Sequence, residues 1–65
     1  MDRLRELRKE QGVARQDLAD EMLISKRTLT RYESGERQPT LSMVFDLADY
    51  FNVSIDYLVG RSDVR

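Results

Sequence analysis

A nine-residue pattern that occurs twice restricts the fold of this chain more than any other feature. Residues 17–25 read DLADEMLIS and residues 46–54 read DLADYFNVS, so five of the nine positions are identical. In each copy apolar residues recur at helical spacing, and a short break leads to a serine, a preferred N-cap residue. Each copy therefore predicts an amphipathic helix, a tight turn and a serine that opens the next helix. Two copies are too few for a solenoid, in which stacked repeats share one core.

The remaining apolar spacing extends this prediction to a complete set of elements. The predicted helices span residues 2–11, about 15–22, about 26–33, 41–51 and 55–59. All three glycines fall at predicted helix ends, where a left-handed residue is common. The apolar face of the fourth helix is the widest in the chain, and it comprises Leu41, Val44, Phe45, Leu47, Ala48 and Phe51. We expect an all-α fold, a compact five-helix bundle over residues 1–60, with residues 61–65 frayed because they bury little.

The composition excludes several classes of function. A chain of 65 residues is too short for two cores, and it contains neither Cys nor His. Thiol catalysis, disulfides and zinc sites built on those residues are therefore excluded, and a small bundle rarely encloses a catalytic pocket. We expect no enzyme, no cofactor and no metal site. No apolar run is long enough for a membrane helix and no signal peptide is evident, so we expect a cytoplasmic protein without a membrane partner.

The distribution of charge is more informative than its sum. The net charge is −1 and the isoelectric point is near 5.3, whereas proteins that bind nucleic acid usually carry a basic surface. Residues 25–32, however, contain three cations and no acid, and residues 39–65 contain four acids and two arginines. This polarity is what an oriented binding face requires.

The two helices around residues 15–22 and 26–33 have the lengths and the connection of a helix-turn-helix, in which the second helix lies in the major groove of DNA. The outward positions of this second helix are Lys26, Arg27, Thr30 and Arg31. Lys and Arg can donate to guanine O6 and N7, and Thr can contact base edges. Lys26 and Arg27 occupy the first helical turn, where cations oppose the helix dipole. A partner phosphate would relieve this conflict.

The stretches LRELRKEQGV, QDLADEM, KRTLTRYESG and QPTLSMVFDLADYFNVSIDYLVG occur in an order that resembles the phage-repressor or Cro-type helix-turn-helix family, also called the xenobiotic-response-element type. The resemblance covers Leu4 to about Gly60 and implies a lambda-repressor-like, five-helix domain that binds double-stranded DNA. It implies phosphate contacts from Arg15, Ser34 and Arg37 and base contacts from residues of the second helix. The complete candidate DNA-binding set is Arg15, Gln16, Ser25, Lys26, Arg27, Thr28, Thr30, Arg31, Ser34 and Arg37.

The resemblance also implies a structural ion pair between Arg8 and Glu33. Three positions depart from the usual family pattern. Leu23 stands where glycine is usual in the turn, at a cost of about 1–2 kcal/mol if its backbone is left-handed. Ala14 stands where threonine usually caps the helix around residues 15–22, and Arg15 replaces a glutamine.

Two functions of different classes fit these patterns. The first is a transcriptional regulator, most simply a repressor that binds DNA as a homodimer on two half-sites. The alternative is a protein-interaction module, antitoxin-like or an adaptor, which keeps the fold and suits the acidic total charge. Apolar residues between Phe51 and Val59 provide either a dimer surface or ordinary core.

Overall fold

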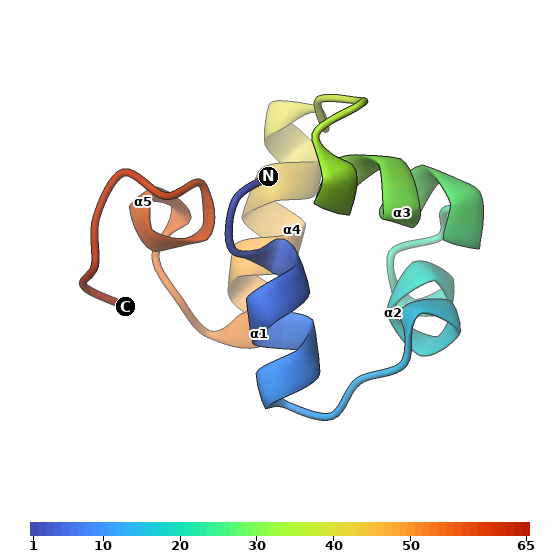
Figure 1. Cartoon of the computed structure of the whole chain (residues 1–65), viewed down its shortest axis with the longest axis horizontal. Coiled ribbons are helices and arrows are strands. Elements are labelled where there is room, and N and C mark those ends of the chain that lie inside the picture. The colour runs from blue at the N-terminus through green and yellow to red at the C-terminus, as the bar shows by residue number, and fades with distance from the viewer.

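The computed structural model describes all 65 residues and contains five helices and no strand. The helices are α1 (Leu4–Glu10), α2 (Arg15–Glu21), α3 (Lys26–Ser34), α4 (Leu41–Phe51) and α5 (Ile55–Leu58). Figure 1 shows α1 in front and α4 behind, with α2 and α3 on one side and α5 on the other. The predicted all-α bundle is confirmed, and the helix ends differ from the predicted ones by at most two residues. No helix combines the length and the apolar character needed to cross a membrane.

Short polar side chains fix the starts of three helices. Ser25, Thr40 and Ser54 each accept a hydrogen bond from the backbone N–H three residues later, at 3.1–3.2 Å. Such a bond satisfies one of the N–H groups that a helix start leaves without a partner. Ala14, before α2, provides no side-chain cap, because a methyl group cannot accept a hydrogen bond.

The two copies of the nine-residue pattern have the same local structure, as predicted. Leu23 follows α2 with φ 58° and Asn52 follows α4 with φ 56°, so both are left-handed. The next residue in each copy donates its N–H to a carbonyl five residues back, from Ile24 to Ala19 and from Val53 to Ala48, each at 3.0 Å. These bonds form the helix-ending motif that usually uses glycine at the left-handed position.

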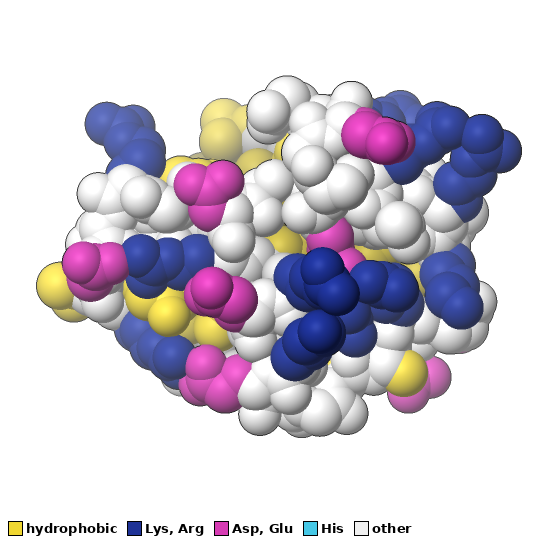
Figure 2. All heavy atoms as spheres, in the orientation of Figure 1, with side chains coloured by type: hydrophobic (Ala, Val, Ile, Leu, Met, Phe, Trp, Pro, Cys, Tyr) yellow, Lys and Arg dark blue, Asp and Glu magenta, His cyan; other side chains and the backbone are white.

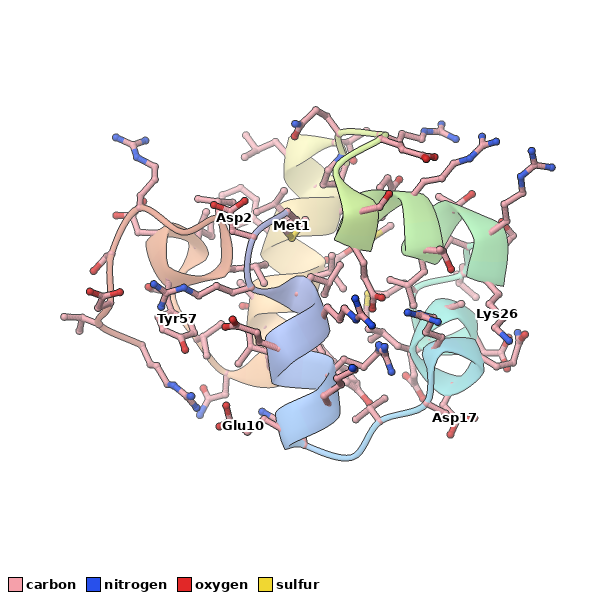
Figure 3. All side chains as sticks on the ribbon, viewed as in Figure 1. Met1, Asp2, Glu10, Asp17, Lys26 and Tyr57 are labelled. Atoms are coloured by element: carbon pink, nitrogen blue, oxygen red, sulfur yellow. The ribbon has the colours of Figure 1, made fainter.

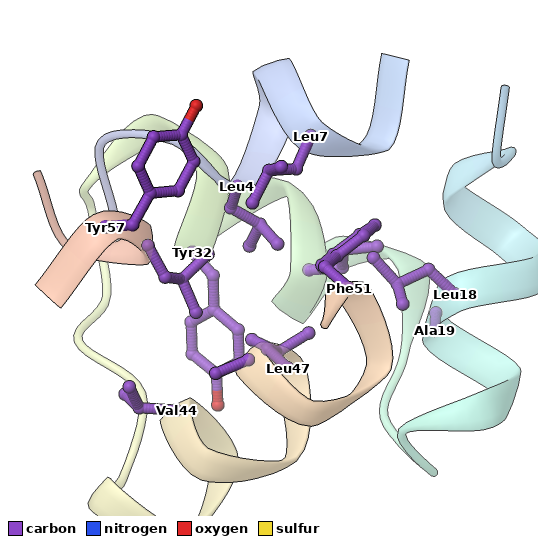
Figure 4. Close-up of a cluster of buried hydrophobic side chains, with 12 residues drawn as sticks. Leu4, Leu7, Leu18, Ala19, Tyr32, Val44, Leu47, Phe51 and Tyr57 are labelled. Atoms are coloured by element: carbon purple, nitrogen blue, oxygen red, sulfur yellow. The ribbon is translucent and has the colours of Figure 1, made fainter. Parts of the chain in front are cut away.

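The core contains twelve buried apolar side chains drawn from all five helices, most of which are labelled in Figure 4. Helix α4 contributes more of them than any other helix: Val44, Leu47, Ala48 and Phe51. The prediction that Leu41 and Phe45 complete this face is wrong, because they are 67% and 48% exposed. The buried stripe of a helix covers only about 100° of its circumference, and both side chains lie beyond its edge. Phe51 and Tyr57 are buried, so they are core residues and not a free surface.

The C-terminal segment 61–65 lies against α1 and α5. The Arg65 guanidinium donates to both carboxylate oxygens of Glu10, at 2.6 and 2.7 Å. The Tyr57 ring faces the guanidinium groups of Arg3 and Arg65, at 4.2 and 5.2 Å. Figure 3 labels Tyr57 and Glu10 on this side of the molecule. The contacts of this segment are therefore exposed ion pairs and cation–π contacts, each of small stability, and fraying of residues 61–65 stays a prediction.

Candidate nucleic-acid interface

The helix pair α2–α3 is held together by its apolar faces. Leu18 and Ala19 of α2 are fully buried, as is Leu29 of α3, and Tyr32 is 6% exposed. The small side chain of Ala19 allows the two helices to approach closely. The left-handed backbone at Leu23 and the cap at Ser25 then set the direction in which α3 leaves the turn. Local sequence therefore determines how α3 is presented to a partner.

The outer face of α3 is cationic and largely unpaired. Lys26, Arg27 and Thr30 are exposed, and the Arg31 side chain is 40% exposed. Arg31 has one acidic neighbour, with 3.8 Å between its Nε and Oε2 of the exposed Glu36. Lys26 and Arg27 form no ion pair, and the first turn of the helix contains no acid. Their charges are therefore available to an external anion.

The hydroxyl groups of the candidate set are occupied by the helix itself. The Ser25 hydroxyl accepts the cap bond from the Thr28 backbone N–H and donates to Thr28 Oγ1 at 2.9 Å. The hydroxyls of Thr30 and Ser34 donate to the carbonyls of Lys26 and Arg31, at 3.0 and 3.1 Å. A hydroxyl rotates at little cost, so these groups can also serve a bound ligand.

Two further residues of the candidate set, Gln16 and Arg37, lie at the margins of this face. Gln16 is exposed on α2, where its amide donates to Asp20 Oδ1 at 2.9 Å. Arg37 is exposed in the connection after α3, and its side chain forms no ion pair. Figure 2 shows Lys and Arg side chains extending from the front of α1 across the ends of α2 and α3. The candidate cations thus occupy one side of the molecule.

A buried ionic cluster joins α1, α2 and α3 behind this side. Glu33 Oε2 lies 2.6 Å from Arg8 Nε, and Glu33 Oε1 lies 2.9 Å from Arg15 Nε. Only 3% of the Glu33 side chain and 10% of the Arg8 side chain are exposed, and Arg8 also donates to the Val13 carbonyl at 3.1 Å. Each charge has a close partner, which is the condition under which buried ions are tolerated. Glu33 therefore does not present a negative charge to an approaching polyanion.

Arg15 was expected to contact phosphate, and the structure gives it a structural role as well, as a partner of the buried Glu33. Its Nε is bound to Glu33, while 34% of the side chain is exposed. The guanidinium is therefore fixed at one edge and open at the other. It faces a pocket of about 170 Å³ whose other lining residues are Arg5, Thr30, Glu33 and Ser34.

Arg5 is the residue of this pocket that our sequence reasoning missed. It is exposed on α1, and its side chain forms no hydrogen bond or ion pair with another residue. The available signal was its position three residues before Arg8, which places both side chains on the same face of the helix. Because Arg8 was expected to pair with Glu33, Arg5 could have been assigned to the α3 side of α1 as well.

Comparisons with known proteins agree with this arrangement. A family model described as helix-turn-helix matches residues 4–58. The HTH-type transcriptional regulator AnsR of Bacillus subtilis is 46% identical over 94% of this chain and 53% of its own length. The regulator ImmR of the same organism is 34% identical over 95% of this chain and 49% of its own length. The phage CTXphi transcriptional repressor RstR of Vibrio cholerae is 40% identical over 92% of this chain and 54% of its own length.

The chain thus spans about half the length of these relatives. No solved structure gives a significant match. The matched residues include all five helices, the turn at Leu23 and the cationic face of α3. The chain therefore belongs to the helix-turn-helix family, as its resemblance to phage-repressor and Cro-type domains indicated.

Proposed function

We propose that this domain is a sequence-specific transcription regulator that places α3 in the major groove of duplex DNA. The observation that carries the proposal is the exposed face of α3, where Lys26 and Arg27 are unpaired at a helix start that disfavours cations. A residue that opposes folding at such a position is expected to serve a partner. Membership of a family that includes named transcriptional regulators supports the same assignment.

The geometry of α3 suggests how its residues divide the work. Arg27 and Arg31 are four residues apart and form one stripe, and Lys26 and Thr30 form the neighbouring stripe. The cationic stripe suits bidentate contacts to guanine, and Thr30, on the neighbouring stripe, lies where its methyl group can face a base while its hydroxyl faces the backbone. Arg15, Ser34 and Arg37 flank this face at positions suited to backbone phosphates. We also propose that the protein acts on this DNA in the cytoplasm.

We further propose that the protein is a repressor and acts as a homodimer. A single domain of this size covers little DNA, and two copies on half-sites one helical turn apart would multiply both affinity and selectivity. The phage repressor among the relatives supports repression. The exposed Leu41 and Phe45 on α4 are available as apolar surface for a partner copy.

Selection of bound sites from random duplexes at a stated salt concentration tests this function. The wild type is expected to enrich one sequence motif. Arg31→Ala is expected to weaken binding to that motif by about 1–3 kcal/mol and to relax base preference at one position. Arg61→Ala is the matched control, because Arg61 is exposed after α5 and forms no ion pair.

Two results would count against the proposal. If Arg31→Ala weakens binding equally on all duplexes, Arg31 is a phosphate contact and does not read bases. If the wild type enriches no motif and its binding to duplexes does not weaken with salt, the domain is better explained as a protein-interaction module.

A further inference from the structure

The pocket between α1, α2 and α3 has a composition unlike that of the core below it. Its lining residues are Arg5, Arg15, Thr30, Glu33 and Ser34, and none of them is hydrophobic. Its volume is about 170 Å³, which is nearly six times the share of one liquid water molecule, ~30 Å³. A tetrahedral group of five heavy atoms therefore fits, whereas a flat apolar ligand would find no partners.

The charges around the pocket do not balance. Arg5, Arg8 and Arg15 bring three positive charges, and Glu33 brings one negative charge. Both carboxylate oxygens of Glu33 are already bound, one by Arg8 Nε and one by Arg15 Nε. The Nη groups of Arg15 and the whole guanidinium of Arg5 have no partner in the protein. The pocket thus offers several N–H donors and an excess of positive charge, which is the pattern that selects an anion.

The hydroxyl groups complete this preference. Thr30 and Ser34 now donate to carbonyl oxygens of their own helix, at 3.0 and 3.1 Å. Either hydroxyl can rotate to donate to an oxygen atom in the pocket. Guanidinium groups match the oxygen spacing of a phosphoryl group in a bidentate way, which a lysine or a water molecule cannot do.

We infer that this pocket binds one phosphoryl group, with Arg5 and Arg15 as its main donors. The inference rests on the proposed function in one respect: the phosphoryl group is taken to be a phosphate of the DNA backbone, beside the groove that α3 enters. Thr30 and Ser34 lie on a stripe of α3 next to that of Arg27 and Arg31. The major groove is about 12 Å wide and a helix with its side chains is about 10–12 Å across. Side chains beside the base-facing stripe therefore meet the sugar–phosphate backbone. Arg5 becomes a DNA contact made by α1.

The first arm of the test measures DNA binding against salt for the wild type, Arg5→Gln and the control Arg61→Gln. Both arginines are exposed and form no ion pair, so both variants should fold, which thermal unfolding checks. For Arg5→Gln we expect the slope of log affinity against log salt to become shallower by about 0.9 for each protomer bound, hence by about 1.8 for the homodimer. If the contact contributes nothing at 1 M salt, that slope means about eightfold weaker binding per contact at 0.1 M. The loss should be the same on selected and unrelated duplexes.

Duplexes with one uncharged methylphosphonate at a time then locate the phosphate. One position in each half-site should weaken the wild type by the effect of one lost contact, which is half of the loss in binding free energy caused by Arg5→Gln in the homodimer, and should leave Arg5→Gln itself unaffected. If no position couples in this way and the salt slope of Arg5→Gln equals that of Arg61→Gln, Arg5 does not contact the backbone. That result overturns the DNA source of the phosphoryl group while a motif enriched by the wild type keeps the proposed function intact.

The second arm uses inorganic phosphate without DNA, followed by NMR of the Arg15 Nε–H and the Thr30 and Ser34 amides. These signals should shift in the wild type and not in Arg5→Gln, with chloride at equal ionic strength as the control. A wild type that selects no duplex but titrates with phosphate would support the pocket with free phosphate as its source and reject the proposed function. Absence of both the phosphate titration and the backbone coupling overturns the inference.

Discussion

The left-handed backbone at Leu23 should make this protein less stable than a variant with glycine at this position. The residue has φ 58° and its side chain is 91% exposed, so it gains little from packing. A non-glycine residue in this conformation costs about 1–2 kcal/mol. Glycine removes that strain but loses about 0.5–1 kcal/mol through the greater freedom of the unfolded chain. Leu23→Gly should therefore raise the free energy of unfolding by about 0.7 kcal/mol.

Thermal unfolding followed by circular dichroism measures this change. For a domain of this size the melting temperature should rise by roughly 3–6 °C. Two variants calibrate the backbone contribution. Gly12→Ala introduces the same strain at φ 68°, where an added Cβ meets no atom within 4 Å, so it should lower the melting temperature. Asn52→Gly should change it little, because asparagine tolerates this conformation.

The reasoning is refuted if Leu23→Gly lowers the melting temperature while Gly12→Ala behaves as described. Leucine would then contribute a contact that its exposure does not reveal. The same pair of variants also separates strain from function, since Leu23 is outside the candidate DNA-binding set and Leu23→Gly should retain wild-type affinity for the selected duplex.

Three further predictions concern charged residues. Glu33→Gln should lower the free energy of unfolding by about 3–5 kcal/mol in urea titration, because it leaves a buried guanidinium without its counter-charge; Glu36→Gln, at an exposed pair, should change it by less than about 1 kcal/mol. Lys26→Glu should raise the free energy of unfolding by roughly 0.5–1 kcal/mol, and with it the melting temperature, because an acid at this position favours the helix dipole; it should nevertheless weaken DNA binding. A variant that is both less stable and weaker in DNA binding would contradict the view that Lys26 opposes the helix dipole. The hydrogen bonds from Arg65 lower the pKa of Glu10. The contribution of this ion pair to stability is therefore complete above the unfolded-state pKa of Glu10 and is lost as the pH falls through its folded-state pKa. NMR titration should find the pKa of Glu10 below its ordinary value in the wild type and at that value in Arg65→Gln.

Local rules explain why much of the fold was predictable. The caps at Ser25, Thr40 and Ser54 and the turn after α2 depend on residues within one helical turn, so the sequence pattern specifies them directly. The strain at Leu23 followed from a departure from the family pattern and is present in the backbone. The cationic face of α3 required only helical periodicity and charge.

Features that depend on distant residues were not predictable in this way. The bond between Arg15 and Glu33 joins residues 18 positions apart, and that between Glu10 and Arg65 joins residues 55 positions apart. Both depend on how whole helices are placed, which periodicity does not specify. The exposure of Phe45 has the same origin, because an apolar residue at the edge of a stripe is buried only if a neighbouring helix covers it.

The most direct test of a reading helix in the major groove changes single atoms of the selected duplex. Replacing a guanine by 7-deazaguanine removes the N7 acceptor in the major groove, and replacing it by hypoxanthine removes only the amino group in the minor groove. We predict that 7-deazaguanine at the position read by Arg31 weakens binding of the wild type but not of Arg31→Ala, while hypoxanthine leaves both unchanged. Weaker binding with hypoxanthine and unchanged binding with 7-deazaguanine would contradict the placement of α3 in the major groove.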